Sequence, residues 1–238
     1  MHGKKVLLVA SSVYVPFYPD GKKTGVHFSE LLEPYKVFRE NGFAVDFTSP
    51  NGSCQFDESS VDESSLPENE KKILHDKQDE FWKDLKRMIP AANVDPADYC
   101  LMFVAGGHAA MFDLPTAVDL HAVAAQIYKN GGVIAAVCHG PVMLPFVQDL
   151  KSKGEVSIVK GKHVTAFSKQ GEQAMGVMNQ MKQHHFRTLN EVFNSAGANF
   201  IDPPDPMGEF VQSDCRVVTG VNPASAIATA KTAVQALS

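Results

Sequence analysis

The sequence predicts a doubly wound α/β fold, in which a mostly parallel sheet of the flavodoxin-like sandwich type carries helices on both faces. Two observations support this prediction. Short apolar runs alternate with amphipathic helical patterns from one end of the chain to the other. Some runs, such as Leu101-Met102-Phe103-Val104, are apolar at every position, as expected where helices cover both faces of a parallel sheet. Ligands of such folds bind outside the carboxyl ends of the strands.

The elements follow from these patterns in chain order. Strands are expected at the apolar runs, which are residues 5–11, 44–48, 99–105, 133–137, 163–167 and 216–219. Helices are expected where apolar residues recur at spacings of three and four, which are residues 26–41, 116–130, 140–150 and 173–195. A last helix begins at Asn222-Pro223, an N-cap followed by proline at the first helical position, and runs to Leu237.

One segment interrupts the alternation. Residues 52–66 are rich in Ser, Asp and Glu, and residues 68–88 form an amphipathic helical pattern that ends before Pro90. This connection is too long for an ordinary link between a strand and a helix. We therefore expect a single domain over residues 1–238, with a small helical insert at about 52–95 that forms a cap over the ligand crevice or a dimer surface.

Composition excludes several functional classes. Hydrophobic content of 44% and charged content of 21% are ordinary for a soluble globular protein. A formal net charge of −5 without a basic cluster argues against nucleic-acid and anionic-membrane partners. No apolar stretch is long enough to span a bilayer, and the N-terminal apolar run is expected to be the first strand rather than a signal peptide.

Cofactor and metal signals are weak. The four cysteines are scattered without CxxC spacing, which argues against zinc clusters and disulfide scaffolds and favours a reducing compartment. The pair His184-His185 is not expected to bind a metal, because adjacent side chains on a helix point in different directions. The sequence has no Gly-rich dinucleotide fingerprint and no phosphate loop, so no cofactor is expected.

The segment that carries chemistry follows the expected strand at 133–137 and reads Val137-Cys138-His139-Gly140-Pro141. A strand followed by Gly-Pro forces a sharp turn, so Cys138 is expected in a strained conformation, exposed at the tip of the sheet. There the N-terminus of the next helix and the imidazole of His139 would give the thiol thiolate character. The alternative is a structural cysteine beside a core histidine, but the strand and the turn favour a nucleophile.

Cysteine catalysis also needs a base, a group that orients the base, and N–H donors for the oxyanion. His139 is the expected base. Glu172 opens a helix directly after an expected strand and is the candidate orienting acid, the alternative being a first-turn acid that complements the helix dipole. Gly106 and Gly107 follow another strand, where their N–H groups can approach a ligand closely. The alternative for this pair is a tight turn that requires positive φ.

Glu30 is the second candidate acid. Pro34 lacks the N–H that would bond the carbonyl of Glu30, so the backbone near Glu30 is kinked or only beginning a helix. Its neighbours Leu31 and Leu32 are expected to pack inward. A carboxyl in apolar surroundings has a raised pKa, which suits proton transfer near neutral pH. The alternative is an ordinary solvated helix residue.

Together these segments resemble the PfpI-like superfamily, relatives of the class I glutamine amidotransferases. Within it they resemble the glutathione-independent glyoxalase (glyoxalase III) branch of small heat-shock-induced proteins. The resemblance covers essentially the whole chain. The matching segments are Lys4-Lys5-Val6-Leu7-Leu8, Asp20-Gly21-Lys22-Lys23-Thr24-Gly25 leading to Glu30, Ala105-Gly106-Gly107-His108, Asn130-Gly131-Gly132-Val133, Ala136-Val137-Cys138-His139-Gly140-Pro141, Gly171-Glu172 and Val218-Thr219-Gly220-Val221-Asn222-Pro223-Ala224-Ser225.

The resemblance implies that Cys138 is the nucleophile, His139 its base partner and Glu172 the third member, with Glu30 touching the cysteine. It implies a stress-response enzyme that converts methylglyoxal to D-lactate through a cysteine hemithioacetal, without glutathione, metal or cofactor. The substrate oxygen would be held by backbone N–H groups near Gly107 and His139, and the proton would be moved by Glu30 or His139. We expect a homodimer that is cytoplasmic and also nuclear, with a small 2-oxoaldehyde as substrate.

Two other functions remain open at this point. A cysteine peptidase or a protein deglycase would use the same Cys138–His139 pair on a larger substrate, and would need an open crevice. A holdase chaperone would need exposed apolar surface rather than the thiol. An amidotransferase is excluded, because its downstream His-x-Glu triplet does not occur in the sequence.

Overall fold

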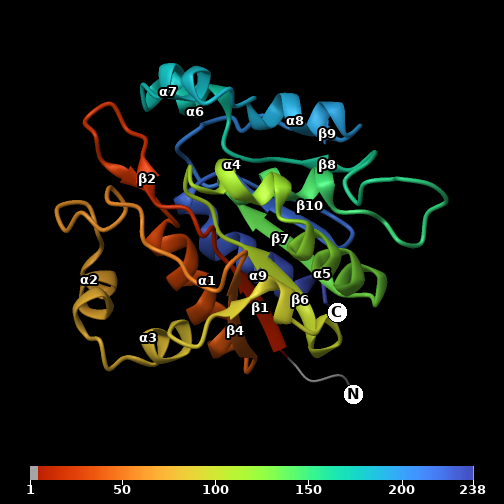
Figure 1. Ribbon diagram of the computed structural model, residues 1–238, viewed down its shortest axis with the longest axis horizontal. Helices are drawn as coiled ribbons and strands as arrows, with labels where there is room; N and C mark the ends of the chain where they lie inside the picture. Colours follow the sequence, from red (N-terminus) through yellow and green to blue (C-terminus); the bar gives the residue numbers. More distant parts are fainter. Residues whose placement is uncertain (1–4, 238) are drawn as a thin grey trace.

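The fold is that of a computed structural model, which describes residues 5–237 (Figure 1). The central sheet has seven strands in the order β10-β11-β7-β6-β1-β4-β5. Every neighbouring pair is parallel except β10 with β11. Helices α1 and α9 pack together against one face of the sheet, and α5 covers β6 and β7 from the other (Figure 1). The predicted doubly wound, mostly parallel sheet is therefore confirmed.

The strands of the central sheet are β1 (Lys5–Val9), β4 (Ala44–Ser49), β5 (Ile89–Pro90), β6 (Tyr99–Val104), β7 (Val133–Val137), β10 (Val211–Asp214) and β11 (Val217–Gly220). Two further pairs of short strands form separate sheets, β2 (Val15–Pro16) with β3 (Lys23–Thr24), and β8 (His163–Val164) with β9 (Asn199–Phe200). Every residue of β7 is buried, which is why its sequence is apolar throughout.

The α-helices are α1 (Phe28–Glu40), α2 (Glu68–His75), α3 (Glu80–Leu85), α4 (Ala110–Asp113), α5 (Val118–Lys129), α6 (Lys169–Ala174), α7 (Met178–Gln183), α8 (Leu189–Ser195) and α9 (Ala226–Gln235). Short 3₁₀ helices are η1 (Ala91–Asn93), η2 (Pro96–Asp98), η3 (Leu114–Thr116), η4 (Gly140–Phe146) and η5 (Pro223–Ser225). Within residues 5–237, no helix has the length and apolar character needed to cross a membrane.

The predicted strand at 163–167 differs most from the structure. Only His163 and Val164 are extended in a ladder, and they pair with β9 outside the central sheet. The N–H of Thr165 donates to the Thr219 hydroxyl at 2.8 Å, and that of Phe167 to the Cys138 carbonyl at 2.9 Å. Because of these two bonds, residues 165–167 run past the end of β7 without regular secondary structure, and the start of α6 lies next to Cys138.

Three predicted helices are also shorter than their apolar patterns. The pattern at 173–195 is divided into α6, α7 and α8, because Gly176 and His185 adopt positive φ of 70° and 57°. Residues 140–150 form only the 3₁₀ helix η4, in which two prolines lack the N–H groups of a regular α-helix. The pattern at 68–88 is divided into α2 and α3.

The insert contributes to the core through an aromatic cluster. Phe81 of α3 is fully buried, and its ring packs edge-on against Phe28, Tyr35 and Phe47. Its neighbour Trp82 packs against the same cluster and donates its indole N–H to a backbone carbonyl at 2.6 Å. The insert therefore belongs to the main core through α3. That it also forms a cap or a dimer surface stays a prediction.

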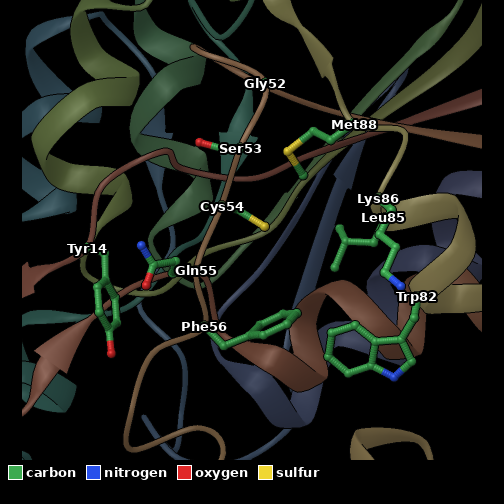
Figure 2. A pocket seen from close by; sticks show the side chains of 10 residues that line it. All are labelled: Tyr14, Gly52, Ser53, Cys54, Gln55, Phe56, Trp82, Leu85, Lys86 and Met88. Carbon is green, nitrogen blue, oxygen red and sulfur yellow. The ribbon is translucent and has the colours of Figure 1, made fainter. Parts of the chain in front are cut away.

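A cavity of about 510 Å³ opens beside this cluster (Figure 2). Figure 2 shows Phe56, Trp82 and Met88 around it, with Cys54 directed toward its interior. None of its lining residues is a site residue predicted from the sequence. The cavity is therefore separate from the cysteine elbow described below.

We expect Phe81→Ala to lower the free energy of unfolding by about 3–5 kcal/mol, because it leaves a hole among packed rings. Phe146→Ala is the control, since Phe146 is 45% exposed and its truncation opens no hole in the core. Urea unfolding of both variants measures the difference. A loss below about 1 kcal/mol for Phe81→Ala would show that the insert is dispensable to the core.

Candidate active site

Cys138 stands directly after β7 with a φ of 60°, in the left-handed region that residues other than glycine seldom adopt. Two backbone bonds hold this conformation. The Cys138 N–H donates to the Gly220 carbonyl at 2.9 Å, and the Cys138 carbonyl accepts from Phe167 at 2.9 Å. The turn is thus fixed by β11 on one side and by the segment before α6 on the other. The strained strand-to-helix turn predicted for Cys138 is present.

The surroundings of the thiol differ from the prediction in two respects. Cys138 is only 5% exposed, so it lies beneath the surface rather than at an open tip. The helix that follows is the 3₁₀ helix η4, not an α-helix whose dipole would favour a thiolate. Burial raises the pKa of the Cys138 thiol well above its usual value, and the nearby Glu30 carboxyl raises it further. The expected exposure of the thiol is therefore wrong, and the raised pKa favours the protonated thiol in the resting site.

His139 and Glu172 form a hydrogen-bonded chain with the thiol. Cys138 Sγ lies 3.3 Å from His139 Nδ1, and His139 Nε2 lies 2.8 Å from Glu172 Oε1. Because the carboxylate accepts from Nε2–H, the neutral imidazole presents the lone pair of Nδ1 to the thiol. His139 and Glu172 are 1% and 2% exposed. The sequence placed both residues near Cys138, and the structure brings all three together.

Glu172 is held in place by its helix. Ser168 caps α6, its hydroxyl accepting from the Gly171 N–H at 3.1 Å, so Glu172 lies in the first turn and points back toward β7. Burial alone would raise the pKa of Glu172, but the two imidazoles hydrogen-bonded to it lower the pKa to about 2. The carboxyl is therefore ionised throughout the physiological range and can orient an imidazole.

Glu30 approaches the thiol from the other side. It lies in the first turn of α1 and is fully buried, so the interpretation of Glu30 as a solvated helix residue is wrong and that of a carboxyl in apolar surroundings is correct. Its Oε2 accepts from the Gly106 N–H at 2.8 Å, and its carboxyl lies near enough to the Cys138 thiol for each group to shift the pKa of the other. Burial raises the pKa of Glu30. Two adjacent buried anions would repel each other, so the thiol and this carboxyl keep at least one proton between them.

The two glycines after β6 serve different purposes. The N–H of Gly106 is taken by Glu30, so it does not act as the oxyanion donor that the sequence suggested. Gly107 has a φ of 97°, and a Cβ there would collide with the Gly25 carbonyl. The Gly107 N–H lowers the pKa of the Cys138 thiol, in opposition to the effect of burial. Within residues 5–237, the N–H groups of Gly107 and His139 donate to no backbone carbonyl, which leaves both available to a substrate oxygen.

Sequence reasoning missed three residues of the site, which are His108, Tyr18 and Asp57. His108 Nε2 lies 2.9 Å from Glu172 Oε2, so one carboxylate joins two imidazoles. The Tyr18 hydroxyl lies 3.3 Å from His108 Nδ1 and 2.8 Å from Asp57 Oδ2. The only available signal was the position of His108 at the end of β6, directly after the glycine pair.

The same cluster has the donor set of a small metal site. His108, His139 and Glu172 place one ligand atom each within 4.8 Å of one another. Each imidazole is paired with one oxygen of the carboxylate, so a cation would have to displace both hydrogen bonds. His184, which the sequence pair had raised as a metal candidate, stacks instead with Phe17 and packs against Phe112.

Comparisons with known proteins show which family the chain belongs to. Residues 23–236 match the DJ-1/PfpI family. The glutathione-independent glyoxalase hsp3102 of Schizosaccharomyces pombe is 57% identical over 235 residues, which cover 99% of this chain and 98% of that protein. The glutathione-independent glyoxalase HSP31 of Saccharomyces cerevisiae is 39% identical over 237 residues, covering 100% and 99% of the two chains.

Among solved structures, the crystal structure of glyoxalase III from Candida albicans superimposes with a TM-score of 0.95. Its chain is 40% identical, and the match covers 99% of this chain and 98% of that one. The kinship that the sequence motifs indicated is confirmed: the chain belongs to the DJ-1/PfpI family.

Proposed function

We propose that this protein is a glutathione-independent glyoxalase that converts methylglyoxal to D-lactate and so serves detoxification and the stress response. One observation carries the proposal: a single buried thiol lies between a carboxyl, Glu30, and an imidazole, His139. An isomerisation that moves a proton between adjacent carbons needs a nucleophile with proton-transfer groups beside it. The names of the full-length relatives support the same activity.

The first step forms a covalent adduct. The Cys138 sulfur attacks the aldehyde carbon of methylglyoxal, an S–C bond forms, and the thiol proton passes to His139 Nδ1, 3.3 Å away. Charge then develops on the former carbonyl oxygen, where the N–H groups of Gly107 and His139 can donate to it. Protonation of this oxygen by the imidazolium of His139 completes the hemithioacetal and returns the imidazole to its neutral form.

The second step moves hydrogen between carbons. A base removes the proton from the hemithioacetal carbon, the electron pair of that C–H bond forms a C=C bond, and the π pair of the ketone moves to its oxygen, which takes up a proton to give an enediol. Protonation of the neighbouring carbon, with loss of the proton from the hydroxyl on the sulfur-bearing carbon, then gives a lactoyl thioester of Cys138. We assign the proton transfer to Glu30, whose second oxygen, Oε1, is buried and has no hydrogen-bond partner within residues 5–237. Water then hydrolyses the thioester, which releases lactate and restores the thiol.

The depth of the thiol favours a small substrate. At 5% exposure, Cys138 leaves little room for an approaching substrate, which fits a three-carbon aldehyde better than a larger molecule. A peptidase or a protein deglycase would have to admit a polypeptide segment to the same atom. The geometry therefore supports these alternatives less well than the glyoxalase.

A holdase chaperone remains a second candidate function, and one observation favours it. Val118, Phe146 and Leu150 are 70%, 45% and 44% exposed and line one common groove. Such a surface could hold an apolar segment of another protein without using the thiol.

We also propose that the protein is a homodimer and that it is located in the cytoplasm and also in the nucleus. The free state of all four cysteines fits a reducing compartment.

We expect Cys138→Ala to reduce lactate formation from methylglyoxal by several orders of magnitude, because the covalent step is lost. The assay uses purified protein with no added thiol. Cys54→Ala is the matched control, because Cys54 is a free cysteine outside the elbow, and it should keep wild-type turnover. Residual activity of Cys138→Ala within tenfold of the wild type would contradict the assignment. Suppression of aggregation should survive the same change if the holdase proposal is correct.

The two acids should respond differently to amide replacement. Glu30→Gln cannot accept a proton, so turnover should fall severely while iodoacetamide still alkylates Cys138. Glu172→Gln keeps an oxygen that can accept from His139, and we expect a loss of about tenfold to a hundredfold. Turnover and alkylation rates of both variants are the measurement. An inactive Glu172→Gln with a nearly normal Glu30→Gln would reverse the assigned roles.

Stability should depend on pH with opposite sign for the two acids. The raised pKa of Glu30 means that its stabilising contribution is full below the unfolded value near 4.5 and is lost as pH rises through the folded value. The lowered pKa of Glu172, about 2, gives a contribution that is present above 4.5 and is lost as pH falls toward 2.

We therefore expect Glu30→Gln to gain stability relative to the wild type as pH rises above about 4.5. The deficit of Glu172→Gln should instead shrink as pH falls from 4.5 toward 2. Urea unfolding at a series of pH values measures both. Parallel pH profiles for the two variants and the wild type would contradict the assigned pKa directions.

A further inference from the structure

A second buried imidazole lies beside the catalytic one. His108 is 2% exposed, and its ring centroid is 4.0 Å from that of His139. Its Nε2 lies 2.9 Å from Glu172 Oε2, whereas His139 takes Oε1 at 2.8 Å. The carboxylate is thus fixed at both oxygens. The reaction scheme above uses the His139 side of Glu172 and gives the His108 side no role.

A second hydrogen-bonded branch runs outward from His108. Its Nδ1 faces the hydroxyl of Tyr18, in the turn between β2 and β3, at 3.3 Å. The same hydroxyl donates to Asp57 Oδ2 at 2.8 Å. Asp57 is 1% exposed, and its other oxygen accepts from the N–H groups of Ser59 and Ser60 at 3.0 and 3.3 Å. The branch therefore ends on a carboxylate that is rigidly held by backbone donors of the insert.

We propose that His108 is a positioning residue of this active site, which holds Glu172 so that His139 stays directed at Cys138, and that Tyr18 and Asp57 hold His108 in turn. The proposal rests on the function proposed above and assigns residues 18, 57 and 108 to that site. A carboxylate held by one donor can rotate about its terminal torsion, whereas donors on both oxygens fix its plane. The imidazole of His139, which donates to Oε1, is therefore held in one orientation.

The surroundings of His108 favour a neutral donor. Burial lowers the pKa of His108, and the neighbouring His139 lowers it further, while Glu172 opposes both effects. The ring of Phe17 stacks on it at 4.6 Å between centroids, which keeps water from that face. A neutral His108 that donates from Nε2 leaves His139 free to carry the positive charge during catalysis, without a second cation beside it.

The Tyr18 hydroxyl can serve His108 in either charge state. It has one hydrogen and two neighbours, Asp57 and His108. When His108 is neutral, the hydroxyl hydrogen turns from Asp57 to Nδ1, which accepts it. When His108 is protonated, its Nδ1–H donates to the hydroxyl oxygen, and the hydroxyl donates to Asp57. The titratable groups that face His108 are Glu172, His139 and Tyr18, with Asp57 one bond beyond. The hydrogen bond between Tyr18 and His108 is therefore kept in both protonation states of His108, and the imidazole ring does not have to move.

The central test compares His108→Ala with His108→Gln. We expect His108→Ala to lower kcat by about tenfold to a hundredfold with KM within twofold, a size typical of groups that orient a catalytic side chain. His108→Gln should recover most of this loss, because an amide N–H can still donate to Glu172. His184→Ala is the control, since this exposed imidazole also stacks on Phe17 and makes no contact with the carboxylate.

A second readout needs no substrate. The rate at which iodoacetamide alkylates Cys138 reports on His139 as its base, and it should fall in His108→Ala and recover in His108→Gln. If the wild type made no lactate but the alkylation rates still followed this order, the proposed function would fail while the positioning role of His108 stood. The two proposals are thus separable.

Tyr18→Phe tests the outer branch with little risk to folding, and Tyr14→Phe is its matched control. Each change removes a phenolic hydroxyl that donates to a carboxylate of the insert at 2.8 Å, but only Tyr18 contacts His108. We expect a kcat loss of about threefold to tenfold for Tyr18→Phe and none for Tyr14→Phe.

Three results would each overturn the proposal. The first is a kcat of His108→Ala within twofold of the wild type. The second is an alkylation rate that does not change in that variant. The third is a His108→Gln variant as impaired as His108→Ala although both unfold at the wild-type temperature. If His108→Ala does not fold, Tyr18→Phe against Tyr14→Phe decides the question, and equal activities of those two variants would refute it.

Discussion

The positive φ of Cys138 is the constraint on which the site depends. A left-handed conformation at a residue other than glycine costs about 1–3 kcal/mol and persists only where neighbouring structure enforces it. Here β11 and the segment before α6 enforce it, each through one backbone bond to Cys138. Because the turn is fixed from two elements, the sulfur and the imidazole of the next residue point to the same side of the sheet, where Glu30 and Glu172 meet them.

Burial then determines the charges of the site. Four ionisable groups, Glu30, Cys138, His139 and Glu172, lie in a region almost without solvent, so each charged form needs a partner. Glu172 has two imidazole donors and remains an anion, whereas Glu30 has one backbone donor and a raised pKa. Two carboxyls with different surroundings can therefore play different roles on either side of one thiol, one orienting a base and the other moving protons.

Much of this arrangement could be read from the sequence, and the limits are physical. The strand, turn and Gly-Pro around Cys138 are local signals, so the strained elbow was predictable. The burial of the thiol was not, because it depends on segments distant in the chain, such as α1, which brings the buried Glu30 beside Cys138. His108 was missed for a similar reason: its role needs Glu172, 64 residues away, which only the folded chain brings to 2.9 Å. Strand β10 was missed because Val211–Asp214 is a polar edge strand without an apolar run.

That edge strand has a consequence for the protein in solution. Exposed sheet edges recruit strands from other chains, and natural proteins limit this by short, polar or proline-bearing edges. Both edges of this sheet follow the rule. At one edge, β5 is two residues long and ends in Pro90. At the other edge, the carboxylate of Asp214 at the end of β10 accepts a hydrogen bond from the backbone N–H of His163. Strands of unfolded chains therefore find little to pair with at either edge, which protects the protein from co-aggregating through its own sheet.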